Sequence, residues 1–221
     1  MEKSEVEMKY EELDNHWKRI FELSWESVCH GSKAISALLI DENGIILTEG
    51  RNRTGEFNCP NPRLSHAETE CIQKLDISKH YLVKTYTLIC ALEPCPMCMG
   101  TAAMSGIRKF IIGCKDDYGG AMRFSNGNKL LLSRNIQVTW MPQFYGDMQR
   151  AFQYIKELIY EKRKEKLEEI LADFMVYNKA GVMAAKSIFD DGWFTDKKPE
   201  DYSVNEIFNE LSARIENRQI N

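Results

Sequence analysis

The chain has 221 residues, of which 43% are apolar, and a formal net charge of −4. This length suits one domain of roughly 150 residues with an appendage, and the weakly acidic charge excludes an overall basic field that would attract a nucleic-acid backbone. The acidic N-terminus lacks the apolar run of a signal peptide and no apolar run could span a bilayer, so we expect a cytoplasmic protein outside the membrane.

The first part of the chain predicts a helix followed by a hairpin. Apolar residues recur at three- and four-residue steps over 10–29, which is typical of an amphipathic helix. Two β-rich runs, 34–40 and 45–50, surround the turn sequence DENG and predict two paired strands. Residues 51–64 are rich in Gly, Asn and Pro, so we expect a loop that leads into a short helix near His66.

Strands and helices then alternate. The apolar run 84–92 is typical of a strand buried on both faces, and a helix follows with Pro96 in its first turn. Further strands are expected at 109–114 and 136–140, with a loop over 116–128 between them. This order of elements predicts an α/β fold, a three-layer α/β/α sandwich around a mixed five-stranded sheet.

The remaining residues predict a helical extension. A helical period continues over 145–178, as one long helix or two in succession, and a last helix is expected at 203–217. We expect residues 1–165 to form the main domain and residues 166–221 a helical C-terminal extension packed on it. Three aromatic side chains of the extension are expected to pack on the body of the protein, with walling of a substrate pocket as the alternative: Phe189, Trp193 and Phe194.

Two cysteines, Cys95 and Cys98, lie three positions apart in LEPCPMCMG, where a strand should end and a helix begin. The positive end of the helix dipole lowers thiol pKa values and favours the thiolate, which suits metal binding or redox chemistry. The pair alone is compatible with both, because a zinc site needs further ligands. The seven cysteines are odd in number and irregular in spacing, which argues against a disulfide framework.

His66 and Glu68 open an earlier helix that also follows a β segment. If both helices begin at the same sheet edge, His66, Cys95 and Cys98 provide three zinc ligands and leave a fourth tetrahedral position for water. Side chains of a first turn lean toward the helix N-terminus, so Glu68 can converge with His66 there. Ser65 and Glu68 also match a capping box, in which Glu68 would only accept a bond from a backbone N–H.

The combination of HAE at one helix start and PCPMC at the next resembles the signature of the zinc-dependent cytidine deaminase superfamily. HAE with LEPCPMCMG is similar to its tRNA-adenosine and guanine deaminase branch. The resemblance implies a zinc deaminase domain over residues 1–165, often a homodimer in this family. It implies Zn²⁺ held by the two cysteines and the histidine, Glu68 as the catalytic acid and base, and three substrate-binding residues: Asn52 in GRNR, Ala67 and Pro94.

The expected reaction is hydrolytic removal of an exocyclic amino group with release of ammonia, in which Glu68 moves a proton from water to the substrate ring. A purine base, a nucleoside or a related small heterocycle is the first expectation, because the chain is acidic and the loop NPRLS departs from the D-P-T-A run of that branch. Adenosine in tRNA is the alternative, favoured by the basic run at 160–166, whose other interpretation is a solvated helix face. A cytosine-type deaminase and a catalytically silent zinc scaffold are further alternatives.

Overall fold

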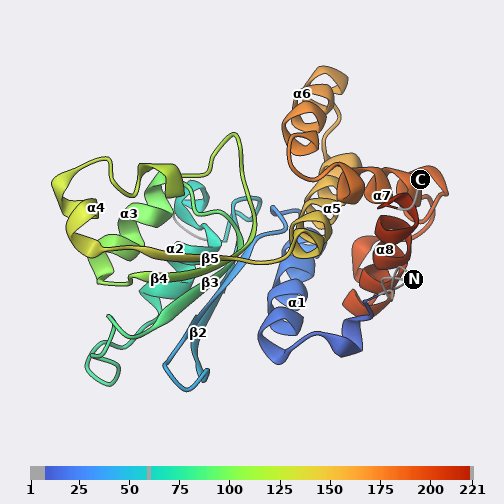
Figure 1. The fold of residues 1–221 in the computed structure, drawn as a ribbon. Helices are drawn as coiled ribbons and strands as arrows, with labels where there is room; N and C mark the ends of the chain where they lie inside the picture. Colours follow the sequence, from blue (N-terminus) through green and yellow to red (C-terminus); the bar gives the residue numbers. More distant parts are fainter. Residues whose placement is uncertain (1–7, 59–60, 220–221) are drawn as a thin grey trace, which may run out of the picture.

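The computed structural model describes residues 8–58 and 61–219, and Figure 1 shows a central sheet between two groups of helices. The strand order is β2-β1-β3-β4-β5; β1 is antiparallel to β2 and β3, whereas β3, β4 and β5 run parallel. The strands are β1 (Ser36–Ile40), β2 (Ile46–Arg51), β3 (Thr87–Leu92), β4 (Lys109–Cys114) and β5 (Gln137–Trp140). The prediction of a mixed five-stranded sheet in an α/β fold is confirmed.

Helices cover both faces of the sheet. On one face lie α2 (Ala67–Gln73), α3 (Pro96–Ser105) and α4 (Lys129–Arg134). On the other face lie α1 (Asn15–Cys29) and α5 (Gln143–Tyr160), and the extension adds a further layer outside them with α7 (Lys179–Asp190) and α8 (Val204–Gln219). The remaining helix, α6 (Lys164–Met175), lies at one end of α5. Every helix in the described part of the chain is too short or too polar to span a bilayer.

The central strands are apolar on both faces because both faces are covered. On β1, Leu38 packs into the cluster with α1, α5, α7 and α8, while its neighbours Ala37 and Leu39 pack into the cluster with α2 and α3. On β3, Ile89 and Leu88 divide in the same way. The sheet therefore separates two apolar cores, and the one on the α1 side extends into the C-terminal helices.

The helical period over 145–178 is two helices in succession, since Glu161 adopts an extended backbone and ends α5. The apolar period of the sequence predicts no separate helix for α7. Its small residues bring it against α5, where a Cβ added at Gly181 would lie 1.8 Å from the backbone oxygen of Asp147. Trp193 stacks on Tyr202 in the larger core, as the packing expectation required.

Candidate metal centre and active site

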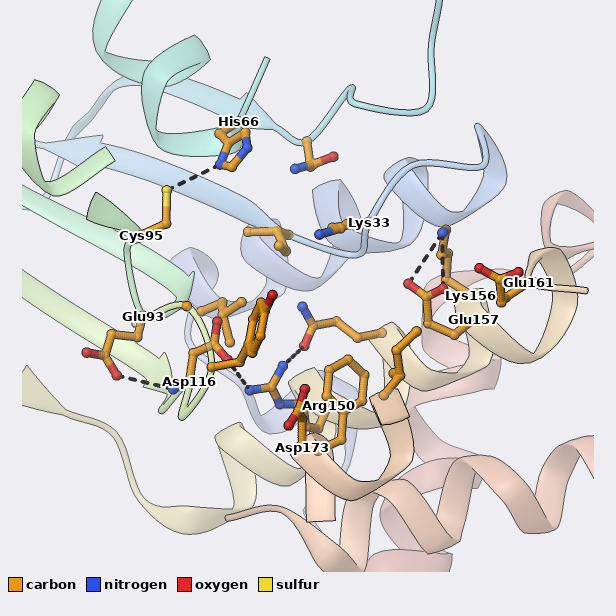
Figure 2. Close-up of a pocket in the computed structure, with 18 of the residues that line it drawn as sticks. Lys33, His66, Glu93, Cys95, Asp116, Arg150, Lys156, Glu157, Glu161 and Asp173 are labelled. Carbon is orange, nitrogen blue, oxygen red and sulfur yellow. Dashed lines mark hydrogen bonds and ion pairs between the residues drawn. The ribbon is translucent and has the colours of Figure 1, made fainter. Parts of the chain in front are cut away.

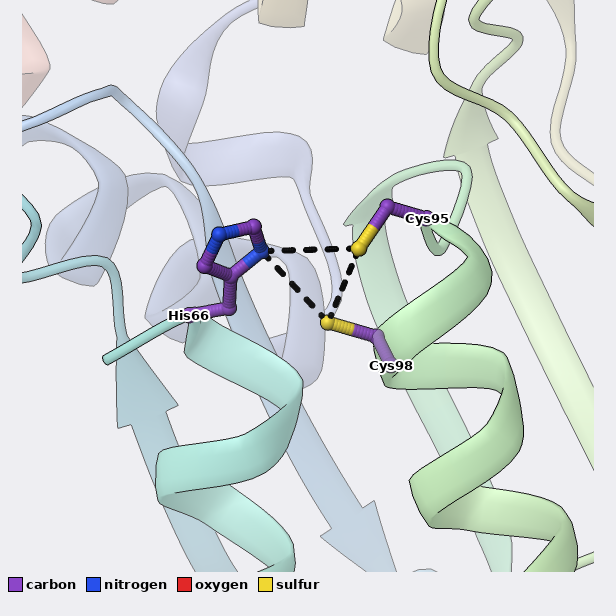
Figure 3. Close-up of side chains that lie close together, drawn as sticks. All are labelled: His66, Cys95 and Cys98. Carbon is purple, nitrogen blue, oxygen red and sulfur yellow. Dashed lines mark hydrogen bonds between the residues drawn. The ribbon is translucent and has the colours of Figure 1, made fainter. Parts of the chain in front are cut away.

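The metal-ligand candidates lie at the N-termini of α2 and α3, which begin next to each other (Figure 3). His66 is the N-cap residue of α2, Cys95 is the N-cap residue of α3, and Cys98 lies in the first turn of α3. Gly50 on β2 allows α2 to lie close to the sheet, because a Cβ at this position would be only 2.1 Å from the backbone oxygen of Ala67. The close packing of α2 on the sheet thus determines the position of His66 at the N-terminus of that helix.

The three side chains form a nearly regular triangle. Cys95 Sγ lies 3.6 Å from His66 Nδ1 and 3.5 Å from Cys98 Sγ, and Cys98 Sγ lies 3.6 Å from His66 Nδ1. With Zn–S of about 2.3 Å and Zn–N of about 2.0–2.1 Å, tetrahedral coordination places two sulfurs about 3.8 Å apart and a sulfur and a nitrogen about 3.6 Å apart. The donor set and its spacing therefore fit Zn²⁺ with three protein ligands.

The electrostatics of the triangle favour a thiolate. The hydrogen bond between Cys95 and Cys98 and the contact with His66 together lower the pKa of Cys95 to about 4. The same hydrogen bond raises the pKa of Cys98, and contact with Cys95 raises the pKa of His66. The thiolate is the form of cysteine that binds metal ions. The cysteines of the described residues are free thiols, and Cys59 lies outside those residues.

Glu68 lies beside the triangle without belonging to it. Its side chain is buried, at 3% exposure, and lines the same cavity as His66 and Cys95. Burial raises the pKa of the Glu68 carboxyl. The capping-box interpretation, with Ser65 as N-cap, does not apply, because α2 begins one residue later and His66 is its N-cap.

Asn52 directly follows β2 and lines the cavity with a side chain that is 1% exposed. Its Oδ1 accepts hydrogen bonds from the backbone N–H and the hydroxyl of Thr54, at 3.1 and 2.7 Å. Its Nδ2 has no hydrogen-bond partner among the described residues. A buried donor without a partner costs roughly 1–3 kcal/mol, which a substrate acceptor would recover.

Ala67 and Pro94, the other two residues expected to bind substrate, differ from Asn52 in their relation to the cavity. Ala67 and Pro94 are buried, and neither lines the cavity in the described part of the chain. The carbonyl of Pro94 accepts a hydrogen bond from the backbone N–H of Ala121. These residues shape the backbone next to His66 and Cys95 but present no side chain to the cavity.

The cavity has a volume of about 510 Å³ and extends from the metal ligands to helices α5 and α6 (Figure 2). Its far wall contains Arg150 and Gln153 of α5 and Ile170 and Phe174 of α6, none of which was predicted to line a substrate cavity. Arg150 and Gln153 lie opposite the apolar face of α5 that contains Met148 and Phe152, so the helical period alone would place them in solvent. The aromatic residues at 189, 193 and 194 do not line this cavity.

Residues 11–114 match the model of the cytidine and deoxycytidylate deaminase zinc-binding region. A probable cytosine deaminase of Schizosaccharomyces pombe is 27% identical over 100 residues, which is 45% of this chain and 59% of that protein. A tRNA(Ile)-lysidine synthase of Deinococcus radiodurans is 28% identical over 137 residues, which is 59% of this chain and 22% of that protein. The chain therefore spans less than two thirds of the length of either relative.

Solved structures of similar fold include NE0047 in complex with 2,6-diaminopurine, with a TM-score of 0.51 and 18% identity over 74% of this chain and 87% of that chain. A guanine deaminase from Nitrosomonas europaea has a TM-score of 0.48 and 18% identity, over 62% of this chain and 81% of that chain. A tRNA:A34 deaminase has a TM-score of 0.46 and 24% identity, over 57% of this chain and 97% of that chain.

The fold and the His-Cys-Cys group define a zinc-binding α/β domain with an acidic residue at the metal group. Residues 11–114, a little under half of the chain, resemble the cytidine and deoxycytidylate deaminase zinc-binding region, and the metal that this match and the His-Cys-Cys group support is Zn²⁺.

Proposed function

We propose that the protein is a hydrolytic deaminase that removes an exocyclic amino group from a purine base, a nucleoside or a related small heterocycle and releases ammonia. The match of residues 11–114 to a deaminase zinc-binding region supports this reaction class. The observation that carries the proposal is Glu68, a buried carboxyl that lines one cavity together with His66 and Cys95 and is not one of the three grouped ligands. A carboxyl in this place can both accept and donate a proton.

The residues of the site would have three roles in this reaction: metal binding, proton transfer and orientation of the substrate. Zn²⁺ held by His66, Cys95 and Cys98 would supply a Lewis acid that makes water nucleophilic near neutral pH. Glu68 accepts the proton of that water, delivers it to the ring nitrogen next to the attacked carbon, and then assists the departure of ammonia. Burial, which raises the pKa of Glu68, makes the protonated state of this carrier accessible. Asn52 Nδ2 donates to an acceptor on the ring and orients it.

The charge of the cavity favours a small substrate over RNA. Its described lining holds four cationic side chains, Lys33, Arg150, Lys156 and Lys166, against six carboxyl groups: Glu68, Glu93, Asp116, Glu157, Glu161 and Asp173. Such a lining has no excess of cationic side chains to attract a polyanion. In the basic run at 160–166, Arg163 pairs with Glu161 and Lys166 pairs with Glu169, as in a solvated helix face. Adenosine in tRNA remains the alternative substrate, and a cytosine-type base follows.

The test measures ammonia release from zinc-loaded protein with a panel of bases, nucleosides and a tRNA anticodon stem-loop. Glu68→Gln should retain zinc and lower kcat by roughly 10²–10⁴-fold, the usual contribution of a general acid and base. Glu70→Gln is the matched control on the same helix, since Glu70 pairs with Arg53 and does not line the cavity. Full activity in Glu68→Gln, or bound zinc with no turnover of any substrate, would contradict the proposal, and the second outcome would favour a zinc scaffold.

We further propose a homodimer, as the family resemblance implies, and retain the division into residues 1–165 and 166–221. The boundary falls in the first turn of α6. Because α6 lines the cavity, the extension takes part in the proposed site. Sedimentation of the purified protein measures its oligomeric state.

A further inference from the structure

The cavity has a second part beyond the metal ligands. Figure 2 shows His66 and Cys95 at one end of the cavity, and side chains of α5 and α6, such as Arg150 and Asp173, away from them. At about 510 Å³ the whole cavity falls within the range of roughly 300–1,000 Å³ typical of small-molecule sites. A single heterocyclic base bound at the metal would leave the α5–α6 end unfilled.

Arg150 builds the wall of this second part. Its Nη1 donates to Gln153 Oε1 at 2.8 Å, and its Nη2 donates to the Lys115 carbonyl and to Asp116 Oδ1, both at 3.0 Å. Its guanidinium carbon lies 4.2 Å from the ring centroid of Phe174 on α6. One buried side chain thus joins α5, α6 and the loop after β4, which is the arrangement of a pre-formed wall.

The charges of the α5–α6 end do not suit an anion. Arg150 is paired with Asp116, and Lys156 lies 3.3 Å from Glu157. Asp173, which faces the cavity in Figure 2, forms no ion pair with a described residue. Carboxylates accept hydrogen bonds from hydroxyl groups, and those bonds are stronger than neutral ones. A phosphate placed there would meet like charge.

We propose that this α5–α6 end is a second subsite, which binds an uncharged, hydroxyl-bearing substituent on the substrate ring, as in a ribonucleoside, and discriminates against a phosphorylated one. The inference rests on the proposed function for the metal end of the cavity. It makes Asp173 a specificity-determining residue, and Asp173 lies outside the segment that matches the family model.

Ligand binding tests the subsite without turnover. Zinc-loaded Glu68→Gln protein is titrated by calorimetry with adenine, guanine and cytosine, with their ribonucleosides, and with the 5′-monophosphates. We expect one ribonucleoside to bind about tenfold more tightly than its free base and about tenfold more tightly than its monophosphate. A base that binds as tightly as its nucleoside, or a monophosphate that binds best, overturns the inference.

Reversal of the charge at residue 173 tests whether Asp173 determines the specificity of the subsite. In the same background, Asp173→Lys should raise the affinity for the monophosphate relative to the nucleoside by about tenfold. Glu168→Lys is the matched control, because it makes the same change in net charge on α6 at an exposed residue outside the cavity lining. An equal effect of both variants would show a long-range field instead of a subsite and would overturn the assignment.

The two proposals fail in different ways. If the nucleoside binds with the expected preference but wild-type protein releases no ammonia from it, the subsite stands and the deaminase function is wrong. If wild-type protein releases ammonia from free bases and binds nucleosides no better, the deaminase function stands and the subsite is wrong.

Discussion

The His66, Cys95 and Cys98 side chains come from two helix starts far apart in sequence, yet their donor atoms lie within hydrogen-bond distance of one another. Because the three ligand atoms are already close together, they need little rearrangement to bind an ion. Zinc binding should therefore depend on each of these three residues and not on nearby cysteines. Cys90 on β3 provides a comparison, since its thiol is fully buried and outside the group.

Cys98→Ala should lose most of its zinc, whereas Cys90→Ala should keep about one zinc per chain. Acidification should release zinc from the wild type, because protons compete for the imidazole and the thiolates. Metal content after dialysis, measured by atomic emission, checks both statements. Equal zinc in the two variants would be inconsistent with the ligand set.

Asn52 allows an isosteric test. Asn52→Asp keeps the oxygen that accepts from Thr54 and removes the Nδ2 donor that has no described partner. If that donor holds the substrate ring, kcat/KM should fall by about 10–100-fold, the value of roughly 1.5–3 kcal/mol for a lost hydrogen bond in a buried site. Zinc content should not change. Steady-state kinetics that match the wild type would remove Asn52 from the site.

The short motifs made the metal group predictable, because a helix start constrains neighbouring side chains over a few residues. Arg150 and Phe174 were not predictable in the same way. They join the cavity only through the packing of α5 and α6 against the loop after β4, and no local spacing encodes that packing. The expectation that Ala67 and Pro94 contact the substrate rested on the motifs alone. Neither side chain lines the cavity in the structure.

Among the elements, α7 depends on a glycine. A Cβ at Gly181 would lie 1.8 Å from the Asp147 carbonyl oxygen, a backbone atom that cannot move without displacing α5. Gly100 is a helical glycine of α3 where an added Cβ would meet no atom within 4 Å. Both positions gain helix propensity on substitution by alanine, so the difference between them isolates the close packing of α7 on α5.

Gly181→Ala should lower the free energy of unfolding by about 1–3 kcal/mol or more, as overpacked cores do. Gly100→Ala should leave it unchanged or raise it by roughly 0.5–1 kcal/mol. Urea unfolding of both variants measures the two values. A stable Gly181→Ala protein would mean that α7 does not pack on α5 as described.

The strands and most helices were predictable from period and turn residues, whereas the period over 145–178 left open one long helix or two, and the structure has the two helices α5 and α6. Helix α7 was not predictable as a separate helix. Its interior is built from small residues such as Ala184 and Ala185, whose burial depends on the partner helix more than on an apolar period. The start of α1 differs for a local reason, since Asp14 accepts from His16 N–H and Trp17 N–H and begins the helix at Asn15.

For the whole molecule, the larger core includes side chains from α1 and from the C-terminal helices together. The rings of Phe21 and Phe208 lie 5.2 Å apart between centroids, and Trp25 Nε1 donates to the Tyr202 carbonyl at 3.0 Å. A chain that stops after residue 165 would expose the α1 and α5 sides of this core. It would also lose most of the α6 wall of the cavity.

We expect the truncated chain 1–165 to be insoluble or to bind a dye for exposed apolar surface, because a large apolar patch drives association. The soluble fraction on expression and the fluorescence of that dye measure this. A monodisperse truncated protein that still holds zinc would show that the metal domain folds independently of the extension.

The pairing of α1 with α8 also bears on the order in which the protein can form during synthesis. Hydrogen bonds join Tyr10 N–H to Asn209 and Ser212 to the Met8 carbonyl, so the segment just before α1 is completed by one that is translated much later. The α2 and α3 side of the sheet draws its buried residues from the first 122 positions only. We therefore expect the core beside the metal ligands to form early during synthesis. The outer side of α1 stays exposed until α8 has been translated.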